Sequence, residues 1–148
     1  MMSIQLRIQR LRKGRGPLPA YHSAHAAGLD LSADLDSPLT IAPGARASVP
    51  TGIALEIPAG YEGQVRPRSG RAIADGLTLI NSPGTIDSDY RGEINVLLVN
   101  LGTAPIEIRS ADRIAQLVIA PVVRVELVEV ADLGNSARGC GGFGHTGR

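Results

Sequence analysis

The 148-residue chain has one cysteine and a formal net charge of +1, with 43% hydrophobic and 20% charged residues. One cysteine excludes an intrachain disulfide, and the near-neutral charge argues against attraction of the whole molecule to nucleic acid or anionic membranes. The length predicts one domain with its own core. Because the sequence has neither an apolar run of about 18 residues nor a signal-peptide core, we expect a cytoplasmic protein with no membrane span.

The first predicted element is a strand in which Ile4, Leu6 and Ile8 alternate with polar residues, the pattern of a half-buried strand. We expect it at a sheet edge or at a subunit interface. A basic cluster, residues 10–16, follows just before two prolines. Clusters this short are more typical of solvated turns than of nucleic-acid sites, so nucleic acid is not an expected partner.

Two histidines, His22 and His25, have a spacing that would suit a metal site. No helical pattern places both rings on one face and no third ligand is near in sequence, so we expect no metal there. Residues 27–31 then begin a strand that carries a single carboxylate, Asp30. Taken alone, Asp30 would be an ordinary surface charge.

Short apolar runs separated by Pro-Gly or Ala-Gly fill residues 38–67, without a sustained helical period. They predict strands at 39–41, 45–49, 52–57 and 63–66. Short strands at this spacing indicate an all-β barrel or sandwich. Residues 67–76 are the one place where a short helix fits. Backbone amides at its start, with Arg68 and Ser69, would suit phosphate oxygens, and a helix cap by Ser69 is the alternative.

Residues 84–93 hold three carboxylates and a tyrosine, and we interpret them as the reacting centre. Turn residues precede the run and an apolar strand follows it, which predicts the loop of a hairpin. In extended backbone Asp87 and Asp89 would share a face and Tyr90 would point away, unless the turn re-aims it. An acidic surface turn is the alternative, because Asp, Ser and Gly occur in any turn.

Further strands are predicted at 77–80, 106–108 and 113–119. The last of these is almost entirely apolar, and we expect other subunits to bury both of its faces. Gln116 interrupts it with an amide that needs hydrogen-bond partners when buried. The pattern ends after residues 122–130, and we expect the glycine-rich residues 131–148 to be mobile without ligand.

Five segments, in order, resemble the five motifs of the trimeric dUTPases of bacterial type. They are Ala27–Leu31, Pro67–Gly70, the central Gly84–Gly92 run, Arg113–Gln116 and the Gly-rich Arg138–Gly147. Arg71 stands where the family usually has an aliphatic residue. Five motifs in order make the resemblance specific, although one alone would be weak.

The resemblance implies an all-β, distorted jelly-roll (β-clip) barrel with one short helix and a flexible C-terminal tail, assembled as a homotrimer with strand swapping. Residues 1–131 would form the barrel domain. Residues 132–148 would be an arm that completes the active site of a neighbouring subunit. Each active site would thus be shared between chains.

The reaction implied is hydrolysis of dUTP to dUMP and pyrophosphate by water attack at the α-phosphorus, which limits uracil in DNA and supplies dUMP. Asp87 would orient and deprotonate the water. Mg²⁺ would be held mainly by the substrate phosphates, with Asp30 bound through water. Asn81 would read uracil, Tyr90 would pack on deoxyribose, and Asn95 would line the base pocket through its backbone. The other implied substrate-binding residues are Arg68, Ser69, Gly70, Thr85, Ile86, Gln116, Arg138, Phe143, His145 and Thr146.

Two other functions remain open at this point. A dCTP deaminase shares the fold, but it uses a glutamate and lacks the Gly-Gly-Phe-Gly tail. A catalytically inactive nucleotide-binding regulatory trimer is the second, although all five motifs keep their functional groups here. Ammonia release would identify the deaminase, and tight dUTP binding without turnover would identify the inactive trimer.

Overall fold

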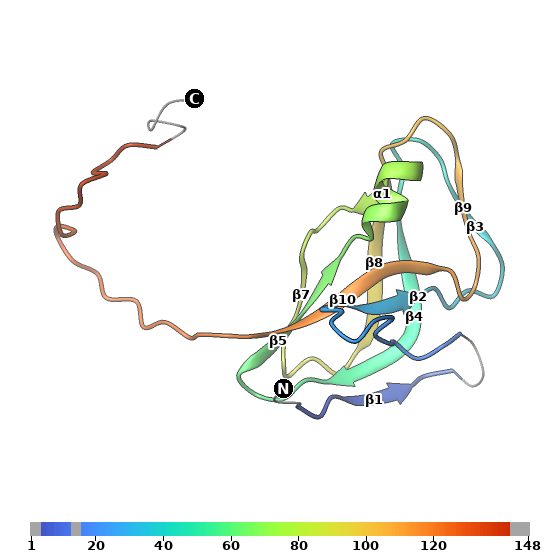
Figure 1. Cartoon of the computed structure of the whole chain (residues 1–148), viewed down its shortest axis with the longest axis horizontal. Coiled ribbons are helices and arrows are strands. Elements are labelled where there is room, and N and C mark those ends of the chain that lie inside the picture. The colour runs from blue at the N-terminus through green and yellow to red at the C-terminus, as the bar shows by residue number, and fades with distance from the viewer. Residues whose placement is uncertain (1–3, 13–15, 143–148) are drawn as a thin grey trace.

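The structure is a computed structural model that describes residues 4–12 and 16–142. Figure 1 shows a body of β-strands and one short helix, from which the C-terminal segment extends as an arm. The elements are β1 (Arg7–Arg10), β2 (Leu29–Ser32), β3 (Leu39–Ile41), β4 (Arg46–Glu56), β5 (Tyr61–Arg66), α1 (Ser69–Asp75), β6 (Leu77–Leu79), β7 (Gly84–Ile86), β8 (Glu93–Asn100), β9 (Ile106–Ile108) and β10 (Arg113–Pro121). The predicted all-β class with one short helix is therefore confirmed.

The strands form two four-stranded sheets and a two-stranded ribbon, with antiparallel pairing throughout. The first sheet has the order β1-β4-β8-β6, the second has the order β2-β10-β5-β7, and β3 pairs with β9. Alternate residues of both sheets point inward and form one hydrophobic core cluster. The most completely buried members are aliphatic: Leu31, Val49, Ile94, Val96, Leu98, Ile108 and Leu117.

The prediction of a hairpin around residues 84–93 is wrong. β7 pairs with β5 in the second sheet, whereas β8 pairs with β4 and β6 in the first. The connecting residues 87–92 therefore cross from one sheet to the other. Turn residues show where the chain changes direction, but they do not determine which strand becomes the neighbour.

The two strands predicted at 45–49 and 52–57 are one long strand, β4. The Pro-Thr-Gly sequence that suggests a turn forms an irregularity inside it, because the pairing with β8 shifts register between Pro50 and Ala54. Gly52 has φ of 69° there, a backbone conformation that favours glycine. Proline within a strand is tolerated at such bulges, where it displaces no ladder hydrogen bond.

At the N-terminus, β1 is an edge strand as predicted, but it begins only at Arg7 and its residues are exposed. The helix predicted within 67–76 is confirmed as α1. Its N-cap is Arg68 without a side-chain cap, so the alternative interpretation of Ser69 as the helix cap is wrong. Gly76 ends the helix in the left-handed conformation, with φ of 72°. No helix among residues 4–12 and 16–142 is long and apolar enough to cross a membrane.

Candidate active site

Asp30 lies at the centre of a charged cluster at one end of the second sheet. Its Oδ1 is 3.2 Å from Arg68 Nε, and its Oδ2 is 3.0 Å from Arg113 Nη1. Arg68 Nη1 also donates to the Arg113 carbonyl oxygen at 3.3 Å, which ties the two arginines together. The Asp30 side chain is only 15% exposed. A half-buried carboxylate thus holds two guanidinium groups in place.

Gln116 is built into the same end of the sheet. On β10 it faces Asp30 of β2 on one side and Arg66 of β5 on the other. Its Nε2 donates to the Pro67 carbonyl oxygen at 2.9 Å, which orients the amide. Gly28 leaves the room for that amide, since a Cβ at this position would overlap Gln116 Oε1. Packing against Gln116 therefore explains why the first motif has a glycine at this position.

These side chains open onto a cavity of about 420 Å³, lined by residues of the loop before β2 and the start of α1 as well. Ser69 and Gly70 are exposed at its wall. His22 also lines it, with Nε2 3.4 Å from Asp30 Oδ2. Two arginines, an amide and the first backbone N–H groups of α1 can all donate hydrogen bonds to phosphate oxygens. We call this cavity the anion cavity and define it by six of its lining residues: Asp30, Arg68, Ser69, Gly70, Arg113 and Gln116.

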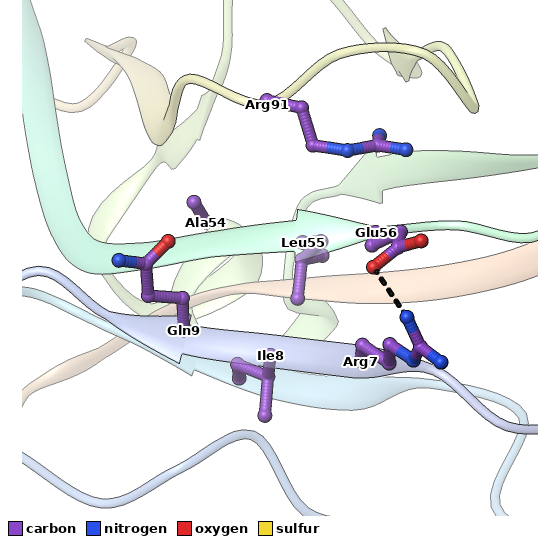
Figure 2. A pocket seen from close by; sticks show the side chains of 7 residues that line it. All are labelled: Arg7, Ile8, Gln9, Ala54, Leu55, Glu56 and Arg91. Atoms are coloured by element: carbon purple, nitrogen blue, oxygen red, sulfur yellow. Dashed lines mark hydrogen bonds and ion pairs between the residues drawn. The ribbon is translucent and has the colours of Figure 1, made fainter.

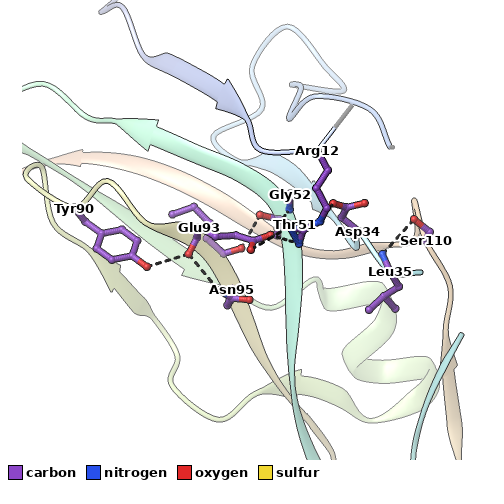
Figure 3. Close-up of polar contacts among 10 residues, drawn as sticks. Arg12, Asp34, Leu35, Thr51, Gly52, Tyr90, Glu93, Asn95 and Ser110 are labelled. Carbon is purple, nitrogen blue, oxygen red and sulfur yellow. Dashed lines mark hydrogen bonds and ion pairs between the residues drawn. The ribbon is translucent and has the colours of Figure 1, made fainter. Parts of the chain in front are cut away.

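The predicted reacting loop lies between β7 and β8. The Tyr90 N–H donates to the Asp87 carbonyl oxygen at 3.1 Å, which closes a turn over residues 88 and 89. The Tyr90 hydroxyl points to the start of β8 and donates to the Glu93 carbonyl oxygen at 3.0 Å, as Figure 3 shows. The turn aims Asp87 and Asp89 into one cavity, of about 530 Å³, which Tyr90 does not line.

The predicted base-reading residues lie along β7 and β8. The Asn81 side chain packs against Gly84, where a Cβ would lie 2.9 Å from Asn81 Nδ2. Thr85 is exposed and Ile86 is half-buried on β7, whereas Asn95 is exposed on β8. The Asn95 Nδ2 donates to the Glu93 carbonyl oxygen at 3.2 Å. Asn81, Thr85 and Ile86 thus lie on the segment that leads to Asp87.

The anion cavity and the reacting loop do not meet within this chain. Gln116 faces Arg66 on β5, whereas Ile86, the residue before Asp87, faces Gly63. From these positions along β5 and the spacing of its two neighbours, the Asp87 and Gln116 Cα atoms are about 16 Å apart. No hydrogen bond or ion pair between described residues joins the two groups.

The C-terminal residues of the predicted site lie apart from both groups. Residues 122–142 form no strand, and Arg138 is exposed, with Nε donating to the Gly141 carbonyl oxygen at 2.8 Å. Phe143, His145 and Thr146 lie outside the described residues. The body of strands ends with β10 at Pro121, and the boundary at residue 131 stays a prediction.

Sequence reasoning missed two cavity residues, His22 and Arg113. Arg113 belongs to the fourth motif, but its role became visible only through its ion pair with Asp30, a residue of another strand. The spacing of His22 and His25 suggested only a metal site, and nothing local linked His22 to Asp30, because that contact comes from the folded loop. Arg71, the departure from the family pattern, pairs with Asp75 one helical turn along α1, away from the anion cavity.

No group of three or more His, Cys, Asp or Glu side chains suited to holding a metal ion occurs within residues 4–12 and 16–142. A further small cavity, of about 160 Å³, lies between β1 and Arg91. Figure 2 shows that the Arg7–Glu56 ion pair lines it, with Arg91 on its other side. The Arg91 guanidinium donates to the Ser88 and Tyr90 carbonyl oxygens, so it fixes the reacting loop.

Comparisons with a family model, a curated relative and solved structures all find similarity to the same family. The sequence model of the dUTPase family matches residues 15–147. A deoxyuridine 5'-triphosphate nucleotidohydrolase from Anaeromyxobacter sp. (strain Fw109-5) is 59% identical over 150 residues, covering 99% of this chain and 100% of the relative. The solved dUTPase of Staphylococcus bacteriophage 80alpha with dUPNHPP has a TM-score of 0.89 at 26% identity, covering 99% of this chain and 100% of that one.

A mutant dUTPase from phage phi11 of S. aureus, in which a structural Mg(II) ion is coordinated, is also similar. Its TM-score is 0.79 at 23% identity, with 89% of this chain and 100% of that chain covered. At this identity the likeness bears on the fold alone. Both phage structures therefore confirm the predicted dUTPase-like fold of the body described above.

Proposed function

The chain belongs to the dUTPase family, and from that premise we propose how its residues divide the work of hydrolysing dUTP to dUMP and pyrophosphate. The activity rests on one observation above all, the 59% identity to a deoxyuridine 5'-triphosphate nucleotidohydrolase over the full length of both chains. The dCTP deaminase and the inactive binding trimer are not favoured by this match.

The activity is tested by measuring pyrophosphate and ammonia release from dUTP, dTTP, dCTP and UTP side by side. We expect rapid pyrophosphate release from dUTP and little from the other three. Ammonia release from dCTP would instead indicate the deaminase. Similar rates with all four substrates would contradict a dUTP-specific enzyme.

The anion cavity binds the triphosphate. Arg68 supplies charge, and Ser69, with the backbone of Gly70, supplies neutral donors at the start of α1. The Gln116 amide has a second N–H beyond the one given to Pro67, and no other described residue accepts it, so it can donate to a phosphate oxygen. Donors fixed before the substrate arrives stabilise the charge that develops on the phosphates without further reorganisation.

The cavity residues fit a magnesium ion carried by the substrate. Asp30 is the carboxylate of the anion cavity and three cationic or imidazole groups already contact it, so it has little capacity for direct ligation. Mg²⁺ keeps several waters and binds substrate phosphates with one or two carboxylates, so Asp30 would contact it through water. When bound, the ion would neutralise phosphate charge.

Asp87 is the general base. Its exposed carboxylate accepts no hydrogen bond within the described residues, so it is free to accept a proton from water. The oxygen of that water forms a bond to the α-phosphorus, while the bond from phosphorus to the bridging oxygen breaks and pyrophosphate leaves. A carboxylate is a sufficient base because the anion cavity stabilises the charge on the phosphates.

The segment before and after Asp87 recognises the nucleoside. Asn81 pairs with the uracil edge, and the backbone of Thr85, Ile86 and Asn95 lines the base pocket. Tyr90 packs on the deoxyribose and leaves no room for a 2'-hydroxyl. The support for this role is that Tyr90 is 45% exposed and that its hydroxyl donates to the Glu93 carbonyl oxygen, which holds the ring in place.

The active site is shared between chains of a homotrimer. Asp87 and Gln116 lie at different ends of β5 in one chain, with Cα atoms about 16 Å apart, and no hydrogen bond or ion pair between described residues joins their two groups. Exposed apolar residues, among them Leu101 just after β8 and Leu127 and Leu133 on the arm, support burial by other copies, with the arms exchanged. Sedimentation equilibrium would test this, and a monomer would contradict it.

The Gly-rich segment from Arg138 to Thr146 closes over the triphosphate of a neighbouring subunit. Arg138 adds charge, Phe143 stacks on the base, and His145 and Thr146 contact phosphate. The support within the described residues is the exposure of Arg138 and the extension of residues 122–142 away from their own body (Figure 1). A cytoplasmic location stays a prediction.

A further inference from the structure

Arg12, from the basic N-terminal cluster, is held between two carboxylates of the body. Its Nε lies 2.8 Å from Asp34 Oδ2, and its Nη2 donates to Glu93 Oε1 at 2.7 Å. Figure 3 shows the guanidinium between the loop that follows β2 and the start of β8. The Asp34 side chain is only 3% exposed, and neither of its carboxylate oxygens accepts a hydrogen bond among the described residues. The ion pair with Arg12 therefore neutralises a charge that would otherwise be buried alone.

The same contacts fill the irregularity in β4. Where the β4–β8 ladder shifts register, the Gly52 N–H donates to Glu93 Oε1 at 2.8 Å instead of to a backbone carbonyl. The Gly52 carbonyl oxygen in turn accepts the Leu11 N–H at 2.8 Å. A side chain at Gly52 would overlap Asp34 Oδ2, so the site is built for the close approach of these groups. We call Arg12, Asp34, Gly52 and Glu93 the bulge clamp.

The bulge clamp contacts Tyr90, the residue proposed to pack on the sugar, through Glu93. The Glu93 carbonyl oxygen accepts both the Tyr90 hydroxyl, at 3.0 Å, and Asn95 Nδ2, at 3.2 Å. The hydroxyl also lies close enough to Gly92 that a Cβ there would overlap it. Tyr90 is 45% exposed, and its hydroxyl contact with Glu93 restrains where the ring lies.

We infer that Arg12 is a positioning residue for sugar discrimination. By holding the Glu93 side chain, it fixes the Glu93 carbonyl oxygen, and through it the distance of the Tyr90 ring from the sugar. A steric wall discriminates against one added hydroxyl only while it stays in place, because a ring that yields slightly admits the larger substrate. The inference rests on the proposed role of Tyr90 and gives the basic cluster a role within the enzyme.

The test measures kcat/KM for dUTP and UTP in variants that cut the connection at successive points. Tyr90→Phe removes the hydroxyl, Glu93→Gln removes the charge that Arg12 binds, and Arg12→Lys replaces a guanidinium that contacts both carboxylates with a single ammonium. Glu93→Gln keeps the Arg12–Asp34 pair, so it does not leave a buried charge unpaired. Arg109→Met is the control, because Arg109 is an exposed arginine paired with Glu107 and lines neither the clamp nor the cavity beside Arg91.

We expect each of the three variants to lower the dUTP/UTP ratio of kcat/KM by about three- to tenfold, and the control to leave it unchanged. Partial unfolding lowers the active fraction for both substrates equally, so it does not alter this ratio. Adding Glu93→Gln to Tyr90→Phe should lower the ratio no further, because the connection is already cut.

Two results would overturn the inference, and they are distinguishable. A further variant, Tyr90→Ala, removes the ring itself. If Tyr90→Ala lowers the ratio while Tyr90→Phe and Glu93→Gln leave it unchanged, Tyr90 is the steric wall but the clamp does not contribute to discrimination. An unchanged ratio in Tyr90→Ala as well would overturn the proposed role of Tyr90 itself.

Discussion

At the scale of single residues, the two carboxylates of the proposed site have opposite surroundings and therefore different roles. Asp30 is contacted by Arg68, Arg113 and His22, and its side chain is largely buried. Asp87 is exposed and its carboxylate accepts no hydrogen bond within the described residues. A carboxylate surrounded by cations organises them, whereas a carboxylate open to water is available to accept a proton.

Replacing Asp87 with Asn tests this division. The substitution keeps the shape of the side chain and removes only its basicity, so we expect hydrolysis to fall by at least about a hundredfold while dUTP binding stays nearly intact. Single-turnover rates and equilibrium titration with dUTP measure the two quantities separately. A loss of binding as large as the loss of rate would show that Asp87 holds substrate instead of activating water.

Gly28→Ala tests the fixed orientation of the Gln116 amide. The added methyl overlaps Gln116 Oε1, and because that atom ends a flexible side chain, the amide will move while the fold persists. We expect kcat/KM for dUTP to fall about ten- to a hundredfold, since small displacements of a positioning group are costly. In a Gln116→Ala background the same substitution should have no further effect. An equal loss in both backgrounds would place the damage elsewhere.

The identities of the site residues could be predicted from the sequence, because each motif keeps its chemistry within a few positions. Their contacts could not. Arg113 and Asp30 are far apart in the chain and meet only because β10 lies beside β2. The same holds for Arg12, whose cluster resembles a solvated turn in sequence and yet reaches a buried carboxylate.

At the scale of elements, Asn100 joins the end of β8 to two other segments. Its Nδ2 donates to the Ile41 and Ala104 carbonyl oxygens, both at 2.9 Å, and its Oδ1 accepts the Gly102 N–H at 2.8 Å. The side chain is 0% exposed. This one amide therefore satisfies three backbone groups where β8, β3 and the loop before β9 come together.

We predict that Asn100→Leu lowers the free energy of unfolding by about 3–5 kcal/mol, because it leaves three backbone groups without partners. Denaturant unfolding, compared with the unmutated protein at equal protein concentration, measures the change. Because Asn100 is remote from the proposed chemistry, KM for dUTP should not change in the fraction that remains folded. A destabilisation below about 1 kcal/mol would mean that water replaces the amide.

The strands themselves could be predicted well from local alternation, but their partners and continuity could not. β3, β9 and β10 follow period-two or continuous apolar patterns. The hairpin error arose because the turn before β8 is genuine while its strands lie in different sheets. The division of β4 was wrong because Pro50 and Gly52 lie in an irregularity inside one strand and do not form a turn. The Gly52 N–H donates there to the Glu93 side chain, which is distant in sequence.

At the scale of the whole molecule, the proposed site is incomplete in one chain. The anion cavity and the reacting loop lie at different ends of β5, and beyond Val122 and Arg124, which line the Asp87 cavity, the arm extends away from the body (Figure 1). The sequence alone could not show this separation, because motifs give order along the chain and not distance. It follows that oligomeric assembly is part of the catalytic mechanism proposed here.

Deleting residues 137–148 should leave a folded assembly that cannot hydrolyse dUTP. Residues 137–142 are exposed or half-buried and form no strand, so their loss removes little of the core. The segment is proposed to close over the phosphates, and closure of such a lid completes many active sites. Circular dichroism and sedimentation test the fold, and pyrophosphate release tests activity. Retained hydrolysis would show that the tail is dispensable.

Mixing this deletion with Asp87→Asn decides whether loop and tail come from different chains. Each parent assembly is inactive by itself, since one lacks every tail and the other lacks every base. If a site takes its loop from one chain and its tail from another, a working site needs a deletion chain at the first position and an Asp87→Asn chain at the second. Random assembly from equal amounts supplies that combination in about a quarter of sites.

If loop and tail came from one chain, every site in a mixed assembly would lack one or the other, and no activity would return. The experiment requires dissociation and reassembly of the two parents, with mixed assemblies verified by mass. Recovery of about a quarter of the unmutated activity would support the shared site. No recovery in verified mixed assemblies would refute sharing between loop and tail and would leave the role of Asp87 unaffected, because that role depends on its carboxylate and not on which chain supplies the tail.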